Sequence, residues 1–151
     1  MKAVIQRVKR SSVSVGGNVI GSIGRGFNIL LGVSEDDTEQ DASILAAKIA
    51  KLRIFEDENE KMNLCLTDVD GEALVISQFT LCADTKKGNR PSFTSAARPE
   101  KAIPLYELFM SELAGNGVKK VEHGEFGADM AVEILNDGPV TIILDTVIWR
   151  R

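Results

Sequence analysis

The chain has 151 residues, of which 44% are hydrophobic and 26% charged, and its formal net charge at pH 7 is −4. This composition predicts one folded domain over residues 1–151 and excludes a disordered or fibrous protein. The apolar runs are too short to span a bilayer, the amino terminus turns polar too soon for a signal peptide, and two cysteines argue against a disulfide framework. We therefore expect a cytoplasmic protein with no membrane partner.

The first third of the chain predicts strands followed by a helix. Apolar alternation and a glycine-rich turn predict strands at residues 2–9, 12–15 and 19–23, and a continuous apolar run predicts a buried strand at 27–33. Leu45, Ile49 and Leu52 recur at helical spacing, which predicts an amphipathic helix over residues 38–51.

The remainder predicts further strands and a second helix. The helix opens at Pro99 or Pro104 and ends at residues 115–117. The predicted strands cover residues 53–55, 62–66, 73–82, 130–135 and 140–148. Together these elements predict an α/β (mixed) fold: a strand-rich single domain whose mixed or antiparallel sheets form a barrel-like core, with about two to three helices packed outside.

The most informative segment is Ser77-Gln78-Phe79-Thr80, which follows the apolar run of residues 73–76. Polar groups at the end of a buried strand need hydrogen-bond partners or face a cavity. The loop that follows carries Lys86, Lys87 and Arg90. A polar strand end beside a cationic loop predicts a site for an anionic ligand, although the net charge is negative. A separate basic cluster, Arg7 to Arg10, is interpreted as solvated surface.

The chemistry of this strand end stays open on the residues alone. Backbone N–H groups around residues 78–80 could stabilise an oxyanion, and the Thr80 hydroxyl could orient water or act as a nucleophile, but no activating base is identified. A β-branched Thr80 also suits a strand on propensity alone. Phe79 is interpreted as a core residue rather than as a stacking platform.

The sequence gives little support for other types of site. The single His123 and the two cysteines lack zinc-site spacing, and no phosphate-loop, dinucleotide or nucleophile-elbow motif occurs. We expect no metal and no cofactor. His123 is interpreted as an exposed loop or strand-end residue. Two alternatives remain open: a serine hydrolase using Ser77 and His123, and a non-catalytic RNA- or nucleotide-binding module using the basic loop.

The Gly138-Pro139 dipeptide has two interpretations. Residues 136–139 can form a plain hairpin turn between the last two strands, which spacing alone favours. Alternatively the pair has a functional role, because glycine before proline tolerates unusual dihedral angles and an X-Pro bond can be cis.

Taken together, these segments resemble the D-aminoacyl-tRNA deacylase family. The similarity runs in order through nearly the whole chain, and its segments are residues 1–8, 31–33, 53–55, 61–63, 77–81, 83–85, 88–93, 128–130 and 136–141. The resemblance implies hydrolysis of the ester bond of D-aminoacyl-tRNA, and of glycyl-tRNA mischarged on tRNA-Ala. It also implies a homodimer with active sites at the subunit interface.

The resemblance further implies roles for individual residues. Ser77, Gln78, Phe79 and Thr80 would form the catalytic pocket for the aminoacylated terminal adenosine, and Ala128 and Met130 would bind substrate. A cis Gly138-Pro139 would enter the partner's pocket, with its carbonyls where an L side chain would point. Lys86, Lys87 and Arg90 would contact tRNA phosphates. Water, assisted by the terminal ribose hydroxyl, would then be the nucleophile in place of Thr80.

Overall fold

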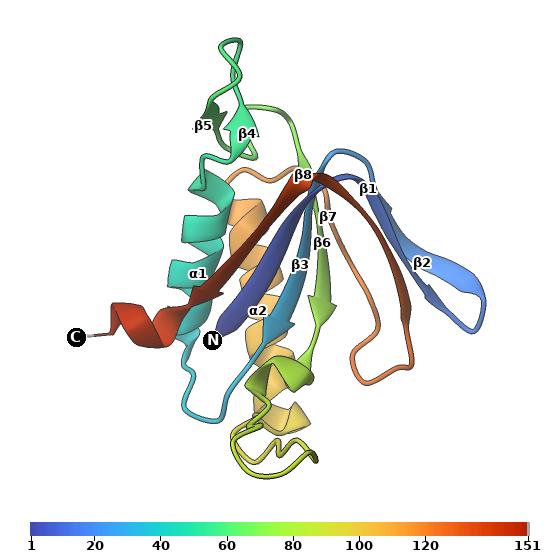
Figure 1. The fold of residues 1–151 in the computed structure, drawn as a ribbon, viewed down its shortest axis with the longest axis vertical. Coiled ribbons are helices and arrows are strands. Elements are labelled where there is room, and N and C mark those ends of the chain that lie inside the picture. The colour runs from blue at the N-terminus through green and yellow to red at the C-terminus, as the bar shows by residue number, and fades with distance from the viewer. Residues whose placement is uncertain (151) are drawn as a thin grey trace.

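One long strand, β1 (Lys2–Val15), organises the sheet. The structure is a computed structural model that describes residues 1–150. The last residue of the predicted domain, Arg151, lies outside the described residues. Along one edge, β1 pairs antiparallel with β8 (Ala131–Asp145). Along the other edge it pairs antiparallel with β3 (Gly26–Gly32) and then with β2 (Asn18–Ile23). Because β1 pairs with other strands along both of its edges, the strands curl around it (Figure 1).

Parallel strands extend the sheet from β3 until it nearly closes into a barrel. β6 (Glu72–Ser77) pairs in parallel with β3, and β7 (Val121–His123) pairs in parallel with β6. β7 then approaches β2 so closely that a Cβ atom added to Gly21 would lie 2.7 Å from the carbonyl oxygen of His123. The result is the predicted mixed, barrel-like sheet in a single α/β domain.

Two helices, α1 (Glu39–Lys51) and α2 (Pro99–Gly115), lie side by side against one face of this sheet (Figure 1). Phe27, Ile29 and Leu31 alternate along β3 and form the large core with residues of both helices. A smaller core lies inside the curl of the sheet, and it comprises Val8, Val13, Ile23, Leu74 and Ile76. Each large apolar side chain buried in this way stabilises the fold by about 1.5–3 kcal/mol.

The small elements complete the chain. β4 (Phe55–Glu56) and β5 (Met62–Leu64) form a separate hairpin, and 3₁₀ turns form at η1 (Phe79–Cys82) and η2 (Thr146–Trp149). Within the described chain, neither α1 nor α2 combines the length and hydrophobicity that a membrane-spanning helix requires.

The predicted helices are confirmed, with α2 starting at Pro99 rather than Pro104, but several strand boundaries were wrong. The strands predicted at 2–9 and 12–15 form one continuous β1, and the strand predicted at 53–55 starts at Phe55. The strand predicted at 73–82 ends at Ser77, because its partner β3 ends at Gly32 and offers no ladder beyond it. Residues 79–82 turn into η1 instead, so Thr80 is not a strand residue.

The predicted hairpin at residues 136–139 was also wrong. Asn136 pairs with Val8 and Thr141 pairs with Gln6, so the chain keeps its direction and both halves of β8 run antiparallel to β1. Residues 137–140 therefore bulge out of the ladder opposite the single residue Arg7. β8 ends at Asp145, and the remainder of the strand predicted at 140–148 forms η2.

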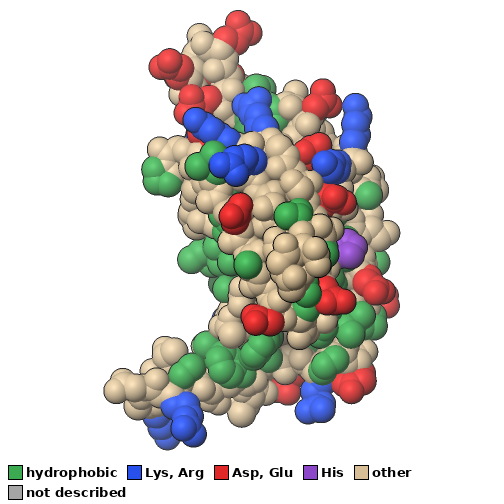
Figure 2. All heavy atoms as spheres, turned by 90° about the vertical axis from the view of Figure 1, so that its right-hand side faces the viewer, with side chains coloured by type: hydrophobic (Ala, Val, Ile, Leu, Met, Phe, Trp, Pro, Cys, Tyr) green, Lys and Arg blue, Asp and Glu red, His purple; other side chains and the backbone are tan. Residues whose placement is uncertain are grey.

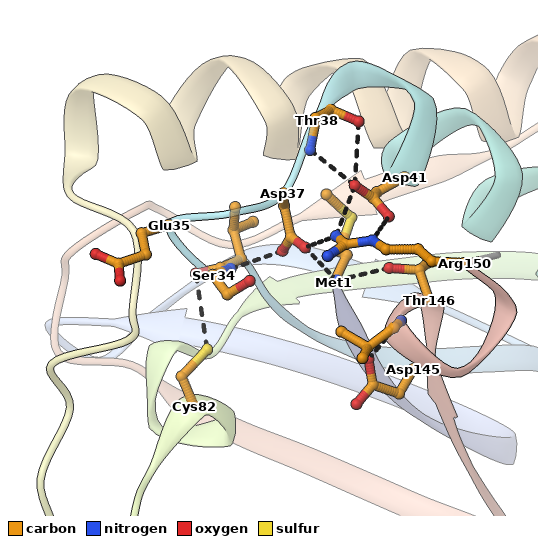
Figure 3. A network of polar contacts seen from close by, with 12 residues as sticks. Met1, Ser34, Glu35, Asp37, Thr38, Asp41, Cys82, Asp145, Thr146 and Arg150 are labelled. Atoms are coloured by element: carbon orange, nitrogen blue, oxygen red, sulfur yellow. Dashed lines mark hydrogen bonds and ion pairs between the residues drawn. The ribbon is translucent and has the colours of Figure 1, made fainter.

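A buried polar network joins the chain ends to the start of α1 (Figure 3). The amino group of Met1 binds the carboxylate of Asp37 and the hydroxyl of Thr146. Arg150 donates to Asp37 and Asp41 at 3.0 and 2.9 Å. Burial raises the pKa of Asp41, but hydrogen bonds from Arg150, Thr146 and Thr38 outweigh it and hold that pKa well below its usual range.

Asp41→Asn should lower the free energy of unfolding at pH 7 by roughly 1–2 kcal/mol, because it weakens the hydrogen bonds to Arg150 and the capping box with Thr38. The native pKa is depressed, so the carboxylate contributes its full stability above its unfolded value of about 3.9 and loses it as the pH falls towards the native pKa. Urea unfolding should show the difference from wild type shrinking between pH 7 and pH 3. Glu39→Gln, in the same helical turn but exposed, is the control. An equal difference at both pH values would contradict this account.

Candidate functional site

A cavity of about 250 Å³ opens where β6 ends. One wall consists of Ile76, Ser77, Gln78 and Phe79, and the other of Phe126, Gly127, Ala128, Met130 and Val132. The structure therefore brings the predicted segment 77–79 together with the predicted residues Ala128 and Met130, which lie some fifty positions apart in the chain.

A larger cavity of about 510 Å³ lies against the start of α1 and η2. Its cationic group is the guanidinium of Arg150, which already binds the carboxylates of Asp37 and Asp41. We place the site in the smaller cavity, because its lining includes backbone and side-chain polar groups that remain available to a ligand.

The end of β6 is folded tightly over β3. The backbone N–H of Gln78 donates to the carbonyl of Leu31 at 2.8 Å, and that of Leu81 donates back to the carbonyl of Gln78 at 3.2 Å. A Cβ atom added to Gly32 would lie 2.9 Å from Cβ of Leu81, so glycine is needed for this close approach. These contacts direct residues 78–79 towards the cavity.

Two adjacent backbone donors lie at this turn. Phe79 and Thr80 begin η1, and among residues 1–150 neither N–H group has a hydrogen-bond acceptor. The side chain of Gln78 donates to the Thr80 hydroxyl oxygen at 2.5 Å and fixes it beside the cavity, whose wall Thr80 itself does not form. Free N–H groups beside an anchored hydroxyl can stabilise a developing oxyanion and orient water.

Phe79 is not a core residue, so its sequence-based interpretation was wrong. Its side chain is 55% exposed, and its ring meets the ring of Phe93 edge-on, with centroids 5.1 Å apart and an interplanar angle of 70°. The physical reason is the turn at η1, which points the ring outwards at the mouth of the cavity instead of continuing the strand into the core.

The predicted basic loop follows this aromatic pair. Asp84 and Ser92 exchange two backbone hydrogen bonds of 2.7 and 2.9 Å, which close the loop at its base. Lys86, Lys87 and Arg90 are exposed beyond that closure, and none of them forms an ion pair within the described chain. Figure 2 shows Lys and Arg side chains beside hydrophobic ones at the lower end of the molecule, where Figure 1 places this loop.

The Gly138–Pro139 peptide bond is cis, as the resemblance implied. Both residues are exposed, and neither lines the cavity of its own subunit. Val132, which does line the cavity, lies on the same strand seven positions before Pro139. Within one subunit, β8 therefore contributes Val132 to the cavity but neither Gly138 nor Pro139.

Arg7 was missed by the sequence reasoning, which assigned it to the solvated surface. It is 5% exposed, and it donates from Nε to the carbonyl of Asp137 at 3.1 Å and from Nη1 to the carbonyl of Ile54 at 2.7 Å. Arg7 thus anchors the bulge that carries Gly138. The signal for its burial was period-two alternation, since Ala3, Ile5 and Arg7 share one buried face of β1.

Gly138 is required at the tip of this bulge. Its φ angle is +129°, a region that side chains of L residues rarely adopt. A Cβ atom there would lie 2.9 Å from Cγ2 of Val140 and 3.0 Å from Nη2 of Arg7. Arg7 therefore fills the space beneath the glycine and supports the exposed dipeptide from below.

His123 lies elsewhere. It ends β7 and lines a separate cavity with residues of α2, and its Nδ1 is 2.6 Å from the carbonyl oxygen of Gly124. Ser77 lines the other cavity, so the geometry does not support a Ser77–His123 pair. Within residues 1–150, no group of three or more His, Cys, Asp or Glu side chains is arranged to hold a metal ion.

Comparison with known proteins adds to this geometry. Residues 4–145 match the family described as D-Tyr-tRNA(Tyr) deacylase. A D-aminoacyl-tRNA deacylase of Sulfurihydrogenibium sp. (strain YO3AOP1) is 61% identical over 97% of this chain and 98% of its own length. The enzyme of the same name from Akkermansia muciniphila is 58% identical, with 97% of each chain covered.

Two solved structures share the fold. One, described as c-Myc DNA Unwinding Element Binding Protein, superimposes with a TM-score of 0.90 at 46% identity, covering 96% of this chain and 98% of its own. The other is a probable eukaryotic D-amino acid tRNA deacylase with a TM-score of 0.79, covering 95% and 97% of the two chains. At 16% identity, this second match shows the fold alone.

Proposed function

Because this chain belongs to the D-Tyr-tRNA(Tyr) deacylase family and is a D-aminoacyl-tRNA deacylase, an ester hydrolase, we propose that it acts on D-aminoacyl-tRNA and on glycyl-tRNA carried by tRNA-Ala, and that it rejects L-aminoacyl-tRNA. The observation that carries the proposal is the cavity at the end of β6, with free backbone donors beside it and an exposed Gly138–Pro139 that is separate from it.

The reaction needs mainly positioning. The terminal adenosine and its ester enter the cavity between residues 77–79 and residues 128–130. Water attacks the ester carbonyl carbon, assisted by the neighbouring ribose hydroxyl, and the negative charge on the carbonyl oxygen is stabilised by the N–H groups of Phe79 and Thr80. The ribose oxygen then leaves with a proton, and the products are the free D-amino acid and tRNA. The anchored hydroxyl of Thr80 positions water or substrate and does not attack.

Selection against L residues comes from a second subunit in a homodimer. Gly138–Pro139 of one copy enters the cavity of the other, where the dipeptide occupies the volume that an L side chain needs. A D side chain points elsewhere and is accepted, and glycine has no side chain to exclude. The exposure of Gly138 and Pro139, and their support by Arg7, fit a rigid element that contacts something outside its own subunit.

Mutual insertion of Pro139 also fixes where the two subunits meet. In a two-fold dimer, the axis passes through the midpoint between Pro139 and the cavity of the same subunit. Val132 lines that cavity and lies on the same strand as Pro139, so the midpoint falls near Leu135. Leu135 is a large apolar residue that is 43% exposed, and within the described residues β8 pairs only with β1, which leaves its other edge open. An exposed apolar residue beside an open edge suits a self-complementary contact.

Turnover with matched substrates tests the proposed function. Purified protein should release the amino acid from D-tyrosyl-tRNA and from glycyl-tRNA-Ala, and it should leave L-tyrosyl-tRNA intact. The measurement is the loss of labelled amino acid from tRNA over time. Binding of all three tRNAs without release of any amino acid would instead favour the non-catalytic RNA-binding module, and equal release of D- and L-tyrosine would rule out chiral selection.

A further inference from the structure

The aromatic pair at the mouth of the cavity is unexplained by ester hydrolysis. Phe79 is more than half exposed, and Phe93 supports it edge-on at a centroid distance of 5.1 Å. An edge-to-face pair leaves one ring face of the exposed member open to a flat partner. Phe93 does not line the cavity, so the pair extends the site outwards from Phe79.

The loop closed by Asp84 and Ser92 connects this pair to positive charge. Phe93 directly follows Ser92, so the backbone bridge that closes the loop also fixes the position of the supporting ring. The backbone at Lys86 is held by its N–H group, which donates to the carboxylate of Asp84 at 2.9 Å. The ring pair and the three exposed cations are therefore parts of one small structural unit.

Aromatic faces beside a cationic strip are the features that bind single-stranded nucleic acid. Bases stack on exposed rings with little sequence preference, while Lys and Arg track the phosphates. Here these features are connected in order: Phe79 lines the cavity, its ring contacts Phe93, and Phe93 follows the bridge that closes the loop with Lys86, Lys87 and Arg90. A strand whose last nucleoside lies in the cavity would pass its preceding nucleotides over the rings and its phosphates along the loop.

We propose that Phe79 and Phe93 form a stacking platform for the unpaired nucleotides that precede the terminal adenosine of the substrate, with the loop of residues 84–92 holding their phosphates. This rests on the proposed function, because it takes the terminal adenosine to occupy the cavity. It adds a ligand to that site: the single-stranded nucleotides of the tRNA 3′ end that precede its last nucleoside. Phe93 acts as a positioning residue, since it supports Phe79 and touches neither the ester nor the attacking water.

Two substrates of different length test the platform. D-tyrosyl-tRNA carries the preceding nucleotides, and D-tyrosyl-adenosine lacks them. Phe93→Leu should raise KM for D-tyrosyl-tRNA about tenfold to hundredfold with kcat unchanged, in line with the usual effect of losing one stacked base. The same variant should leave kcat/KM for D-tyrosyl-adenosine within about twofold of wild type. Phe93→Tyr keeps the ring and should restore the KM for tRNA, and Val19→Ala, an exposed apolar residue on β2, should change neither substrate.

A binding measurement keeps the test independent of turnover. Fluorescence anisotropy with a labelled single-stranded oligonucleotide ending in CCA should show the same loss of affinity in Phe93→Leu. The proposal is overturned if Phe93→Leu binds the oligonucleotide as wild type does, or if it loses activity equally on both substrates, because an equal loss indicates a distorted cavity. If wild type hydrolyses neither substrate yet the oligonucleotide result holds, the proposed hydrolysis fails while the platform stands as a binding site for single-stranded RNA.

Discussion

Pro139→Ala should hydrolyse L-tyrosyl-tRNA at least about 100-fold faster than the wild-type protein, which corresponds to about 3 kcal/mol of lost discrimination. Pro139 is exposed at the tip of a bulge and lines no part of its own cavity, so its ring is free to occupy space in a second subunit. The proline ring restricts the backbone of the dipeptide, so without it the carbonyls no longer stay in the volume that the L side chain needs. Release of labelled tyrosine under single-turnover conditions measures the effect, and the rate with D-tyrosyl-tRNA should stay within a few-fold of wild type.

Two further variants test whether the loss of L rejection comes from the dipeptide. Arg7→Met keeps an apolar stem of similar length but removes the hydrogen bonds to Asp137 and Ile54, so it should relax L rejection in the same direction by loosening the bulge. Pro104→Ala, an exposed proline inside α2, is the matched control and should reject L-tyrosyl-tRNA as wild type does. A folded Pro139→Ala dimer that still leaves L-tyrosyl-tRNA intact would show that the dipeptide is not the filter.

Leu135→Asp should convert the dimer to monomers and raise hydrolysis of L-tyrosyl-tRNA by at least about 100-fold, because each cavity then lacks the Gly138–Pro139 dipeptide of its partner. The proposed axis lies near Leu135, so the two introduced carboxylates would face each other across it in an apolar contact and repel. The residue is 43% exposed in one subunit, so the substitution should leave the monomer folded. Analytical ultracentrifugation gives the mass, and the tRNA assay gives the activity.

Ile44→Asp is the matched control for this change. Ile44 is 42% exposed and lies on α1, a different element from the strand that carries Leu135, so the same charge is introduced at nearly the same exposure. It should remain dimeric and should reject L-tyrosyl-tRNA as wild type does. A Leu135→Asp protein with the mass of a dimer that still leaves L-tyrosyl-tRNA intact would place the subunit contact elsewhere.

The sequence predicted those elements whose determinants are local. Leu45, Ile49 and Leu52 recur at helical spacing, and α1 forms at nearly the predicted positions. Residues 136–139 show the limit of such reasoning, because their composition suits a hairpin as well as a bulge. Whether a hairpin or a bulge forms depends on β1, which is long enough to pair with both flanks of the dipeptide. No local sequence pattern predicts that length.

The candidate site was predictable only in part for the same reason. The polar strand end at Ser77 to Thr80 is visible locally, but its neighbours across the cavity come from residues 126–132 and were named only through the resemblance. Phe79 was misassigned because a strand continuing to residue 82 would have turned its ring inwards, and the strand stops where β3 stops. Arg7 could have been found from its alternation with Ala3 and Ile5, although an arginine in that pattern is ordinarily assigned to the surface.

In the proposed dimer each cavity is filtered by the other subunit, and a mixed dimer can separate this arrangement from filtering within one subunit. One subunit carries Ala128→Trp, which fills its cavity, and the other carries Pro139→Ala with its cavity open. A second mixed dimer carries both substitutions on one subunit and pairs it with a wild-type subunit. Two different affinity tags isolate each mixed species, and L-tyrosyl-tRNA is the substrate. Filtering across the interface predicts that the first dimer rejects L-tyrosyl-tRNA and the second hydrolyses it; hydrolysis by the first and rejection by the second would contradict the claim.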